Sequence, residues 1–190
     1  MVREDNFPLL REQSLLYLLE IVKTKQPNRI LEIGTCIGFS GISMLKQCAG
    51  SLTTIEIDEE RAKQALQNFK NENLATRVNL IVGDATELLK SNKVDDRYDL
   101  IFLDGPKAQY IRQLPYLIEL LNVGGVLVAD NVLFRGYVEK PESAPKRFKT
   151  IVKRLNEFID MAKRDHRLSD VRVEHIEDGL LIATKTKEDI

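Results

Sequence analysis

The stretch RILEIGTCIGFSG, residues 29–41, joins a short apolar run to a turn with three glycines and to the start of a helical segment. The apolar run ends at Gly34, and the helical segment continues to about Cys48. A short apolar strand, a glycine turn and a helix together form the repeating unit of an open α/β sheet. This stretch therefore predicts the first strand of such a sheet.

The same pattern recurs along the chain. Four more apolar runs follow, at residues 51–58, 78–84, 98–105 and 125–131. Helical patterns separate them or precede the first strand, at 9–24, 59–73, 85–92 and 108–122. Five apolar strands that alternate with helices are typical of a parallel sheet covered on both faces. Two final runs, 171–176 and 180–186, are joined by only three residues, which predicts a hairpin. We therefore expect an α/β fold with seven strands, of which the last is antiparallel.

The composition is that of one globular domain, residues 1–190, with a helical segment at 1–28 and the sheet with its helices at 29–190. The net charge of −1 excludes a general attraction to nucleic acid or to membranes, so any such affinity needs a local patch. The chain has two cysteines, no apolar signal core and no run of roughly 20 apolar residues. These features predict a protein of the reducing cytoplasm without a membrane segment.

The five parallel strands share a feature at their carboxyl ends, where ligands bind in open α/β sheets. Each end carries an acidic residue: Glu32, Glu56, Asp84, Asp104 and Asp130. One acidic residue at such a place is more often a turn residue than a ligand contact. Five acidic ends on one edge of the sheet indicate a ligand site.

The turn after the first strand departs from the dinucleotide fingerprint G-x-G-x-x-G. Cys36 stands where a middle glycine would let the backbone approach a pyrophosphate, and Glu32 would repel phosphates. Glu56 can accept hydrogen bonds from both hydroxyls of a ribose, and Asp84, followed by Ala85, can meet the edge of an adenine. A nucleoside without phosphates and with a cationic tail describes S-adenosylmethionine. An NAD-linked oxidoreductase and a non-catalytic nucleotide-binding module are the alternatives.

The segments LEIGTCIGFSG, TIEID, GDA, FLDGPKAQY and ADNVLFRG, in this order and spacing, resemble the cation-dependent O-methyltransferase family. That family includes catechol and caffeoyl-CoA methyltransferases, and the resemblance extends from about Pro8 to Lys185. It implies a Rossmann-like class I fold of S-adenosylmethionine-dependent methyltransferases. It also implies cofactor contacts from Leu10, Glu32, Gly34, Thr35, Gly38, Ser40, Glu56, Ile57, Asp84, Ala85 and Asp104.

A metal site is predicted where the fourth and fifth strands end. Asp104 ends the fourth strand, and Asp130 and Asn131 end the fifth. Ends of adjacent strands lie close together, and carboxylate and amide oxygens are the ligands that Mg²⁺ prefers. The resemblance implies the same assignment, because the family binds its metal through the matching Asp, Asp and Asn. The alternative is that Asp130 caps a helix or an Asx-turn and that Asn131 fills the turn.

The expected chemistry follows from such a metal. A substrate with two neighbouring oxygens would chelate the metal, which lowers the pKa of a bound hydroxyl. Lys107, three residues after Asp104, is placed to hold or deprotonate that hydroxyl, and the two residues form the predicted catalytic pair. A divalent cation nearby should lower the pKa of Lys107, whereas the alternative is a solvated loop lysine. His166 and His175 lie outside every motif and are interpreted as structural or surface residues.

A basic segment bears on the acceptor substrate. Residues 142–164 show an apolar stripe at helical spacing, with Lys146, Arg147 and Lys149 crowded into the first half. Cations near a helix N-terminus oppose the helix dipole, so we expect these residues, with Arg135, to contact RNA. The segments DNVLFRGYV, PKRFK and DGLLIATK look most like the bacterial TrmR-type tRNA methyltransferases. That resemblance implies binding of the tRNA anticodon loop and methylation of wobble 5-hydroxyuridine to 5-methoxyuridine.

Two features qualify this assignment. The near-neutral pI of about 6.2 favours a small catechol-like acceptor with vicinal oxygens, which is the alternative substrate. About 28 residues precede the first strand, where relatives carry an additional helix that helps to cover the substrate. This departure affects the lid over the substrate and the dimer contact that the relatives imply. A homodimer is therefore one of two open alternatives for this chain.

Overall fold

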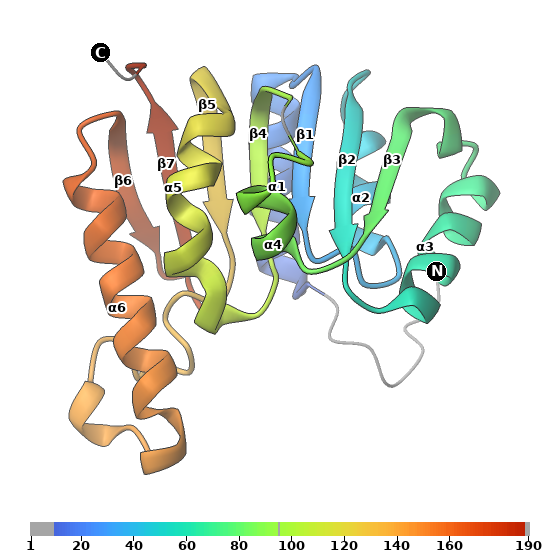
Figure 1. Cartoon of the computed structure of the whole chain (residues 1–190). Helices are drawn as coiled ribbons and strands as arrows, with labels where there is room; N and C mark the ends of the chain where they lie inside the picture. The colour runs from blue at the N-terminus through green and yellow to red at the C-terminus, as the bar shows by residue number, and fades with distance from the viewer. Residues whose placement is uncertain (1–9, 95, 189–190) are drawn as a thin grey trace.

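The computed structural model describes residues 10–94 and 96–188 as a seven-stranded sheet between two layers of helices (Figure 1). The strand order is β3-β2-β1-β4-β5-β7-β6. The strands are β1 (Arg29–Ile33), β2 (Ser51–Glu56), β3 (Val78–Val82), β4 (Tyr98–Leu103), β5 (Leu121–Ala129), β6 (Leu168–Glu174) and β7 (Leu180–Lys185). Strands β1 to β5 are parallel, and β7 runs antiparallel to both β5 and β6. The predicted fold class and the final hairpin are confirmed.

Three helices cover each face of the sheet. In Figure 1, α4 (Ala85–Lys90), α5 (Tyr110–Leu120) and α6 (Lys149–Arg164) lie in front of the sheet. The opposite face is covered by α1 (Glu12–Lys25), α2 (Phe39–Leu45) and α3 (Glu59–Asn71). Short 3-10 turns complete the chain: η1 (Ala75–Arg77), η2 (Lys107–Gln109), η3 (Pro141–Ser143) and η4 (Lys146–Phe148). No helix in the described part of the chain is both long and apolar enough to cross a bilayer.

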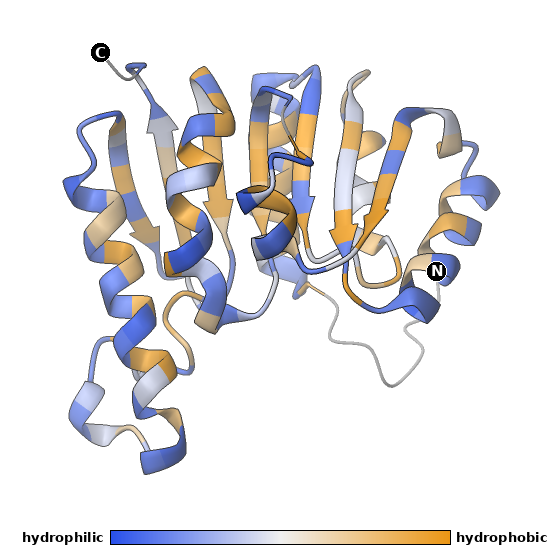
Figure 2. Ribbon diagram, in the orientation of Figure 1, coloured by the Kyte–Doolittle hydropathy of each residue, from blue (hydrophilic) through white to orange (hydrophobic). Residues whose placement is uncertain are grey.

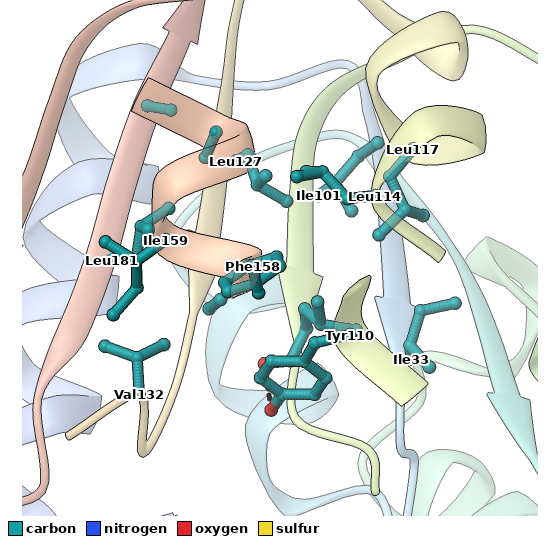
Figure 3. Packing of buried hydrophobic residues seen from close by; sticks show 14 of the residues in the cluster. Ile33, Ile101, Tyr110, Leu114, Leu117, Leu127, Val132, Phe158, Ile159 and Leu181 are labelled. Carbon is teal, nitrogen blue, oxygen red and sulfur yellow. Dashed lines mark hydrogen bonds between the residues drawn. The ribbon is translucent and has the colours of Figure 1, made fainter. Parts of the chain in front are cut away.

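The two helix layers enclose two apolar clusters because successive strand residues point to opposite faces. In β4, Ile101 and Leu103 pack toward α5 and α6, whereas Leu100 and Phe102 pack toward the other layer. The apolar residues concentrate in the strands and on the inner faces of the helices, as Figure 2 shows. In the front layer, the rings of Tyr110 and Phe158 meet edge to face with centroids 5.4 Å apart (Figure 3). This packing fixes α5 and α6 over the carboxyl half of the sheet.

The segment before α6 differs from the prediction. The sequence pattern indicated one helix over 142–164, but the observed helix begins at Lys149. Pro145 has an extended backbone, and a separate 3-10 turn over Lys146–Phe148 follows it. The residue before a proline is disfavoured in the helical region, which explains the break. The dipole argument therefore does not apply to Lys146 and Arg147, which precede the helix.

Candidate active site

A cavity of about 630 Å³ opens at the carboxyl edge of the sheet, the lower edge in Figure 1. Its wall combines the ends of β1 to β5 with residues from the start of α1, from η2 and α5, and from the β6–β7 turn. The predicted site residues in the wall are Leu10, Gly34, Glu56, Ile57, Asp84, Ala85, Asp104, Lys107, Asp130, Asn131 and Arg135. The structure therefore brings together residues that are up to 125 positions apart in the chain, from Leu10 to Arg135.

Other predicted residues do not line this cavity. Thr35 and Gly38 lie in the glycine turn and Ser40 in the first turn of α2; all three are buried, and their contact with a cofactor stays a prediction. The three basic residues Lys146, Arg147 and Lys149 are exposed and lie outside the wall. They belong to the segment that projects beyond the carboxyl edge of the sheet in Figure 1.

The glycine turn is fixed by a close approach of two strand ends. Gly34 has a φ of +103°, and a Cβ atom there would lie 2.5 Å from the carbonyl oxygen of Asp104. Only glycine tolerates both conditions. The backbone N–H of Cys36 donates to Glu56 Oε2 at 2.7 Å, and the N–H of Asp58 donates to Glu56 Oε1 at 3.0 Å. The Glu56 carboxylate is thus held in place in the cavity wall by the turn after β1 and by the start of α3.

Glu32 lies beneath the same turn and is fully buried, with 0% of its surface exposed. Its carboxylate accepts hydrogen bonds from the hydroxyls of Ser40 and Thr54. Burial raises the pKa of Glu32 to about 7, although both hydroxyl contacts oppose the rise. The sequence pattern suggested a charge that faces phosphates, and the structure corrects this interpretation. The Glu32 side chain lies on the buried side of the turn, and its hydrogen bonds with Ser40 and Thr54 stabilise the turn from that side.

The β3 end of the cavity combines a helix cap with an apolar surface. Asp84 caps α4, because its Oδ1 accepts from the N–H groups of Thr86 at 2.8 Å and Glu87 at 3.1 Å. It also lines the cavity, so the structural and the ligand-binding interpretations of this residue are compatible. Ile57, at the end of β2, lines the same part of the wall with 63% of its surface exposed. The isoleucine side chain can pack on one face of a planar nucleobase, and the neighbouring carboxylate can accept hydrogen bonds from the polar edge of that nucleobase.

The β4 and β5 ends hold the two predicted metal-binding carboxylates side by side. The backbone N–H of Asp104 donates to Ile33, and that of Asp130 donates to Leu103 at 3.0 Å. The buried hydroxyl of Tyr110 lies 3.0 Å from the carbonyl oxygen of Leu103 and 3.1 Å from that of Asp130, and it donates between them. Because these contacts join the last residues of two neighbouring strands, Asp104 and Asp130 face the same end of the cavity.

Charged side chains are crowded together at this end of the cavity. Lys107 Nζ donates to Asp104 Oδ1 at 2.8 Å, whereas Asp130 Oδ1 is buried and has no hydrogen-bond partner among the described residues. Burial raises the pKa of Asp130 to about 7, the charge of Asp104 adds to the rise, and Lys107 opposes it. Burial also raises the pKa of Asp104, against the effect of Lys107. Two crowded carboxylates with an unused oxygen are the donor set that a hard divalent cation fits.

Lys107 lies in the cavity wall and forms an ion pair with Asp104. Burial alone would lower the pKa of its ammonium group, but Tyr110 and Asp104 outweigh burial and raise the pKa above its ordinary value. The lower pKa that is expected beside a bound divalent cation stays a prediction, because it concerns the metal-bound site. Lys107 is also no solvated loop lysine, since only 15% of its side chain is exposed. It is a charged donor inside the cavity.

Within residues 10–94 and 96–188, no group of three or more His, Cys, Asp and Glu side chains is arranged to hold a metal. The predicted set contains only two carboxylates, and its third member is the amide of Asn131. Asn131 lines the cavity and has a φ of 55°, in the left-handed region. Asparagine adopts this region more readily than most residues, so the loop can turn its side chain at the strand end.

The β6–β7 turn holds the loop that follows Asn131. Asp178 accepts a hydrogen bond from the backbone N–H of Arg135 through its side chain and one from Leu133 through its carbonyl oxygen. Phe134 and Arg135 both have a φ in the left-handed region, and these contacts hold them there. Asp178 also lines the cavity, which the sequence reasoning missed. The signal was available in the three-residue turn, because a hairpin next to β5 must end beside the β5 loop.

An aromatic cluster connects this loop to the basic segment. The ring of Phe148 has Phe134 at 5.3 Å and Tyr137 at 6.1 Å between centroids. The guanidinium groups of Arg135 and Arg147 lie 5.6 and 4.6 Å from the centroid of the same ring. Both arginines are therefore positioned by cation–π contacts next to the end of the cavity that holds Asp130. Lys146 and Lys149 flank this cluster on the exposed side.

Comparisons with known proteins agree with this geometry. A family model described as O-methyltransferase matches residues 8–186. A caffeoyl-CoA O-methyltransferase of Stellaria longipes is 32% identical over 149 residues, which are 73% of this chain and 62% of that protein. A catechol O-methyltransferase of Mycobacterium tuberculosis is 34% identical over 113 residues, 58% of this chain and 51% of that protein. The chain thus spans less than two thirds of the length of these two relatives.

Two solved structures share the whole fold. The methyltransferase PaMTH1 of Podospora anserina, bound to S-adenosylhomocysteine, has a TM-score of 0.84 and 25% identity, covering 95% of this chain and 83% of that chain. The O-methyltransferase of Bacillus cereus, also in complex with S-adenosylhomocysteine, has a TM-score of 0.82 and 25% identity, covering 93% and 82%. Both structures show that this fold binds the product of the predicted cofactor.

The buried Glu32 predicts a pH-dependent stability. Because its folded-state pKa of about 7 lies above the ordinary value of 4.5, the folded protein binds this proton more tightly. Its contribution to the free energy of unfolding is therefore full below pH 4.5 and declines as the pH rises to about 7. Because of Glu32, the free energy of unfolding of the wild type should fall by about 2 to 3 kcal/mol between about pH 5 and about pH 8. We expect this fall to be absent in Glu32→Gln. Urea unfolding of both proteins across this range measures it, and parallel curves would contradict the placement of Glu32.

The position of Glu56 predicts its role in cofactor binding. Glu56→Ala should weaken the affinity for S-adenosylhomocysteine at least about tenfold, because charge-assisted hydrogen bonds contribute roughly 1.5–3 kcal/mol. Asp58→Ala is the matched control, since it removes the side-chain cap of α3 but no residue of the cavity wall. Calorimetric titration should give the control an unchanged dissociation constant. A Glu56→Ala variant that binds as tightly as the wild type would remove Glu56 from the pocket.

Proposed function

The chain belongs to the O-methyltransferase family and is an S-adenosylmethionine-dependent enzyme, and we propose that it methylates the 5-hydroxyl of 5-hydroxyuridine at the tRNA wobble position. The product would be 5-methoxyuridine. The observation that carries the choice of acceptor is the pair Arg135 and Arg147, which meet on Phe148 beside the carboxylate end of the cavity. An RNA strand that delivers a base to that end would meet this positively charged pair, which supports the proposal.

The arrangement of the cavity supports one orientation of the cofactor. S-adenosylmethionine, when bound, supplies an electrophilic methyl group on a sulfonium sulfur. Glu56 would bind the ribose hydroxyls, and Ile57 and Asp84 would take the base at the β3 end. The methyl group would then point toward Asp104 and Lys107, at the other end of the same cavity.

A divalent cation, most simply Mg²⁺, belongs to this proposal. Asp104, Asp130 and Asn131 would hold it, and the buried Oδ1 of Asp130, which lacks a partner among the described groups, supports that assignment. Mg²⁺, when bound, would lower the pKa of the acceptor hydroxyl and fix its orientation. The 5-hydroxyl and the 4-carbonyl of 5-hydroxyuridine are vicinal oxygens, so this base offers the same pair of donors as a catechol.

The chain's own residues complete the mechanism. Lys107, whose Nζ donates to Asp104 at 2.8 Å inside the cavity, would hold the acceptor hydroxyl or remove its proton, and as a charged group it would stabilise the negative charge that develops there. The Phe134 and Tyr137 rings would stack on an unpaired base, which is more easily presented by an anticodon loop than by a duplex. Arg135, Lys146, Arg147 and Lys149 would contact phosphates.

A small catechol-like molecule is the second candidate acceptor. The relatives named above are catechol and caffeoyl-CoA methyltransferases, and a catechol has the same vicinal oxygens. The net charge of −1 also favours a small acceptor, because it provides no general attraction to RNA. The two candidates share the cofactor, the cation and Lys107. They differ only in whether the basic segment contributes to substrate binding.

The metal proposal predicts the behaviour of Asp130→Ala. The variant should lose turnover and lose calorimetric binding of Mg²⁺ or Mn²⁺, because half of the carboxylate set is gone. It should still bind S-adenosylhomocysteine, since the nucleoside lies at the other end of the cavity. The wild type should likewise lose activity in EDTA and recover it with Mg²⁺. Full activity in the chelator would contradict the metal proposal.

The RNA proposal predicts a change in salt dependence when Lys146, Arg147 and Lys149 are all replaced by Ser. The slope of log affinity for tRNA against log salt should decrease by about 0.7 for each phosphate contact that the substitutions remove. The melting temperature should change little, because all three side chains are exposed and the packing contact that is lost is that of Arg147 with the Phe148 ring. The matched control replaces Lys23, Lys25 and Lys93, which are exposed near the opposite edge of the sheet. Equal slopes for both triple variants would favour the small acceptor.

A further inference from the structure

Gln113 is a buried polar residue that the mechanism above does not use. It lies in the first half of α5, only 2% of its surface is exposed, and its side chain lines the cavity. Its amide Nε2 donates to Thr86 Oγ1 at 3.1 Å. Its Oε1 is buried without a hydrogen-bond partner in the described chain. A buried acceptor left unpaired costs about 1–3 kcal/mol, so an unpaired acceptor in a cavity wall indicates that a ligand supplies the donor.

The surroundings of Gln113 indicate which part of a ligand this is. Thr86 belongs to the first turn of α4 and follows directly after Asp84 and Ala85, which line the cavity at the end of β3. Asp84 caps α4, because its Oδ1 accepts hydrogen bonds from the first backbone N–H groups of that helix. Two acceptors therefore face one region of the wall, one from the α4 cap and one from α5. The Thr86 contact holds the amide of Gln113 through Nε2 and leaves Oε1 as its unpaired acceptor among the described residues.

We infer that Gln113 is a specificity-determining residue that accepts a hydrogen bond from the exocyclic amino group of the cofactor's adenine. Asp84 accepts the second hydrogen of the same amino group, and Thr86 orients the Gln113 amide. The inference depends on the nucleoside orientation proposed above, with the ribose at Glu56. A purine with a carbonyl oxygen at that position would present an acceptor to two acceptors, so the site should reject it.

The test compares S-adenosylhomocysteine with S-inosylhomocysteine, in which that amino group is replaced by a carbonyl oxygen. Calorimetry of the wild-type chain should show at least about tenfold tighter binding of the adenosyl compound. Gln113→Met keeps the size of the side chain and removes the acceptor. This variant should bind the adenosyl compound about three- to tenfold more weakly and the inosyl compound no more weakly, which reduces the preference by that factor.

Two further variants separate this role from a structural one. Thr86→Val keeps Oε1 but frees the amide to rotate, so it should reduce the adenosyl preference in the same direction. Gln109→Met is the matched control: Gln109 in η2 also has a buried Oε1 in the wall, but no bond holds it against Thr86. Its adenosyl preference should equal that of the wild type. A general loss of stability would weaken both ligands alike and leave their ratio unchanged.

The possible outcomes are distinct. An unchanged ratio in a folded Gln113→Met variant would overturn the inference and leave the proposed function intact. If that variant does not fold, an unchanged ratio in Thr86→Val has the same meaning. A reduced ratio in Gln109→Met alone would move the adenine contact to η2 and also overturn it. A wild-type chain that binds neither compound would overturn both the inference and the proposed cofactor orientation.

Discussion

The approach of Gly34 to the backbone of Asp104 is the constraint on which the rest of the site depends. The turn after β1 can pass this close to the end of β4 because Gly34 has no side chain and a positive φ. The same approach places Cys36 where its N–H reaches Glu56 and places Asp104 where it faces Asp130. The Glu56 end and the Asp104–Asp130 end of the cavity are therefore held in one frame by contacts that all involve the backbone of the strand ends and of the turn after β1.

Much of this arrangement could be predicted because it follows from the order of parallel strands. Alternating apolar runs and helices predict the sheet, and a three-residue link predicts the final hairpin. Parallel strands end at the same edge, so the acidic residues at these ends are brought together. Glu56, Asp84, Asp104 and Asp130 line the cavity there, whereas Glu32 is buried. The pairing of Asp104 with Asp130 follows from the adjacency of β4 and β5.

The remaining features depend on side-chain packing, which residue patterns do not encode. Glu32 faces inward because Ser40 and Thr54 offer it hydroxyl partners beneath the turn. The pKa of Lys107 is raised because Tyr110 and Asp104 together outweigh the effect of burial. Asp178 and Gln113 reach the cavity from the β6–β7 turn and from α5: the position of Asp178 follows only from the placement of the final hairpin, and no motif marks Gln113. The break before α6 was recoverable from Pro145, and its effect is to place Arg147 on the Phe148 ring.

The central claim is that this enzyme methylates a tRNA base, and its most direct test is the tRNA of the organism itself. Nucleosides from total tRNA would be quantified by mass spectrometry in a strain that lacks this protein, beside the same strain complemented with the wild type or with Asp130→Ala. The account predicts that 5-methoxyuridine disappears, that 5-hydroxyuridine accumulates, and that only the wild type restores the balance. An unchanged level of 5-methoxyuridine in the deletion strain would contradict the account and leave the small catechol-like acceptor in its place.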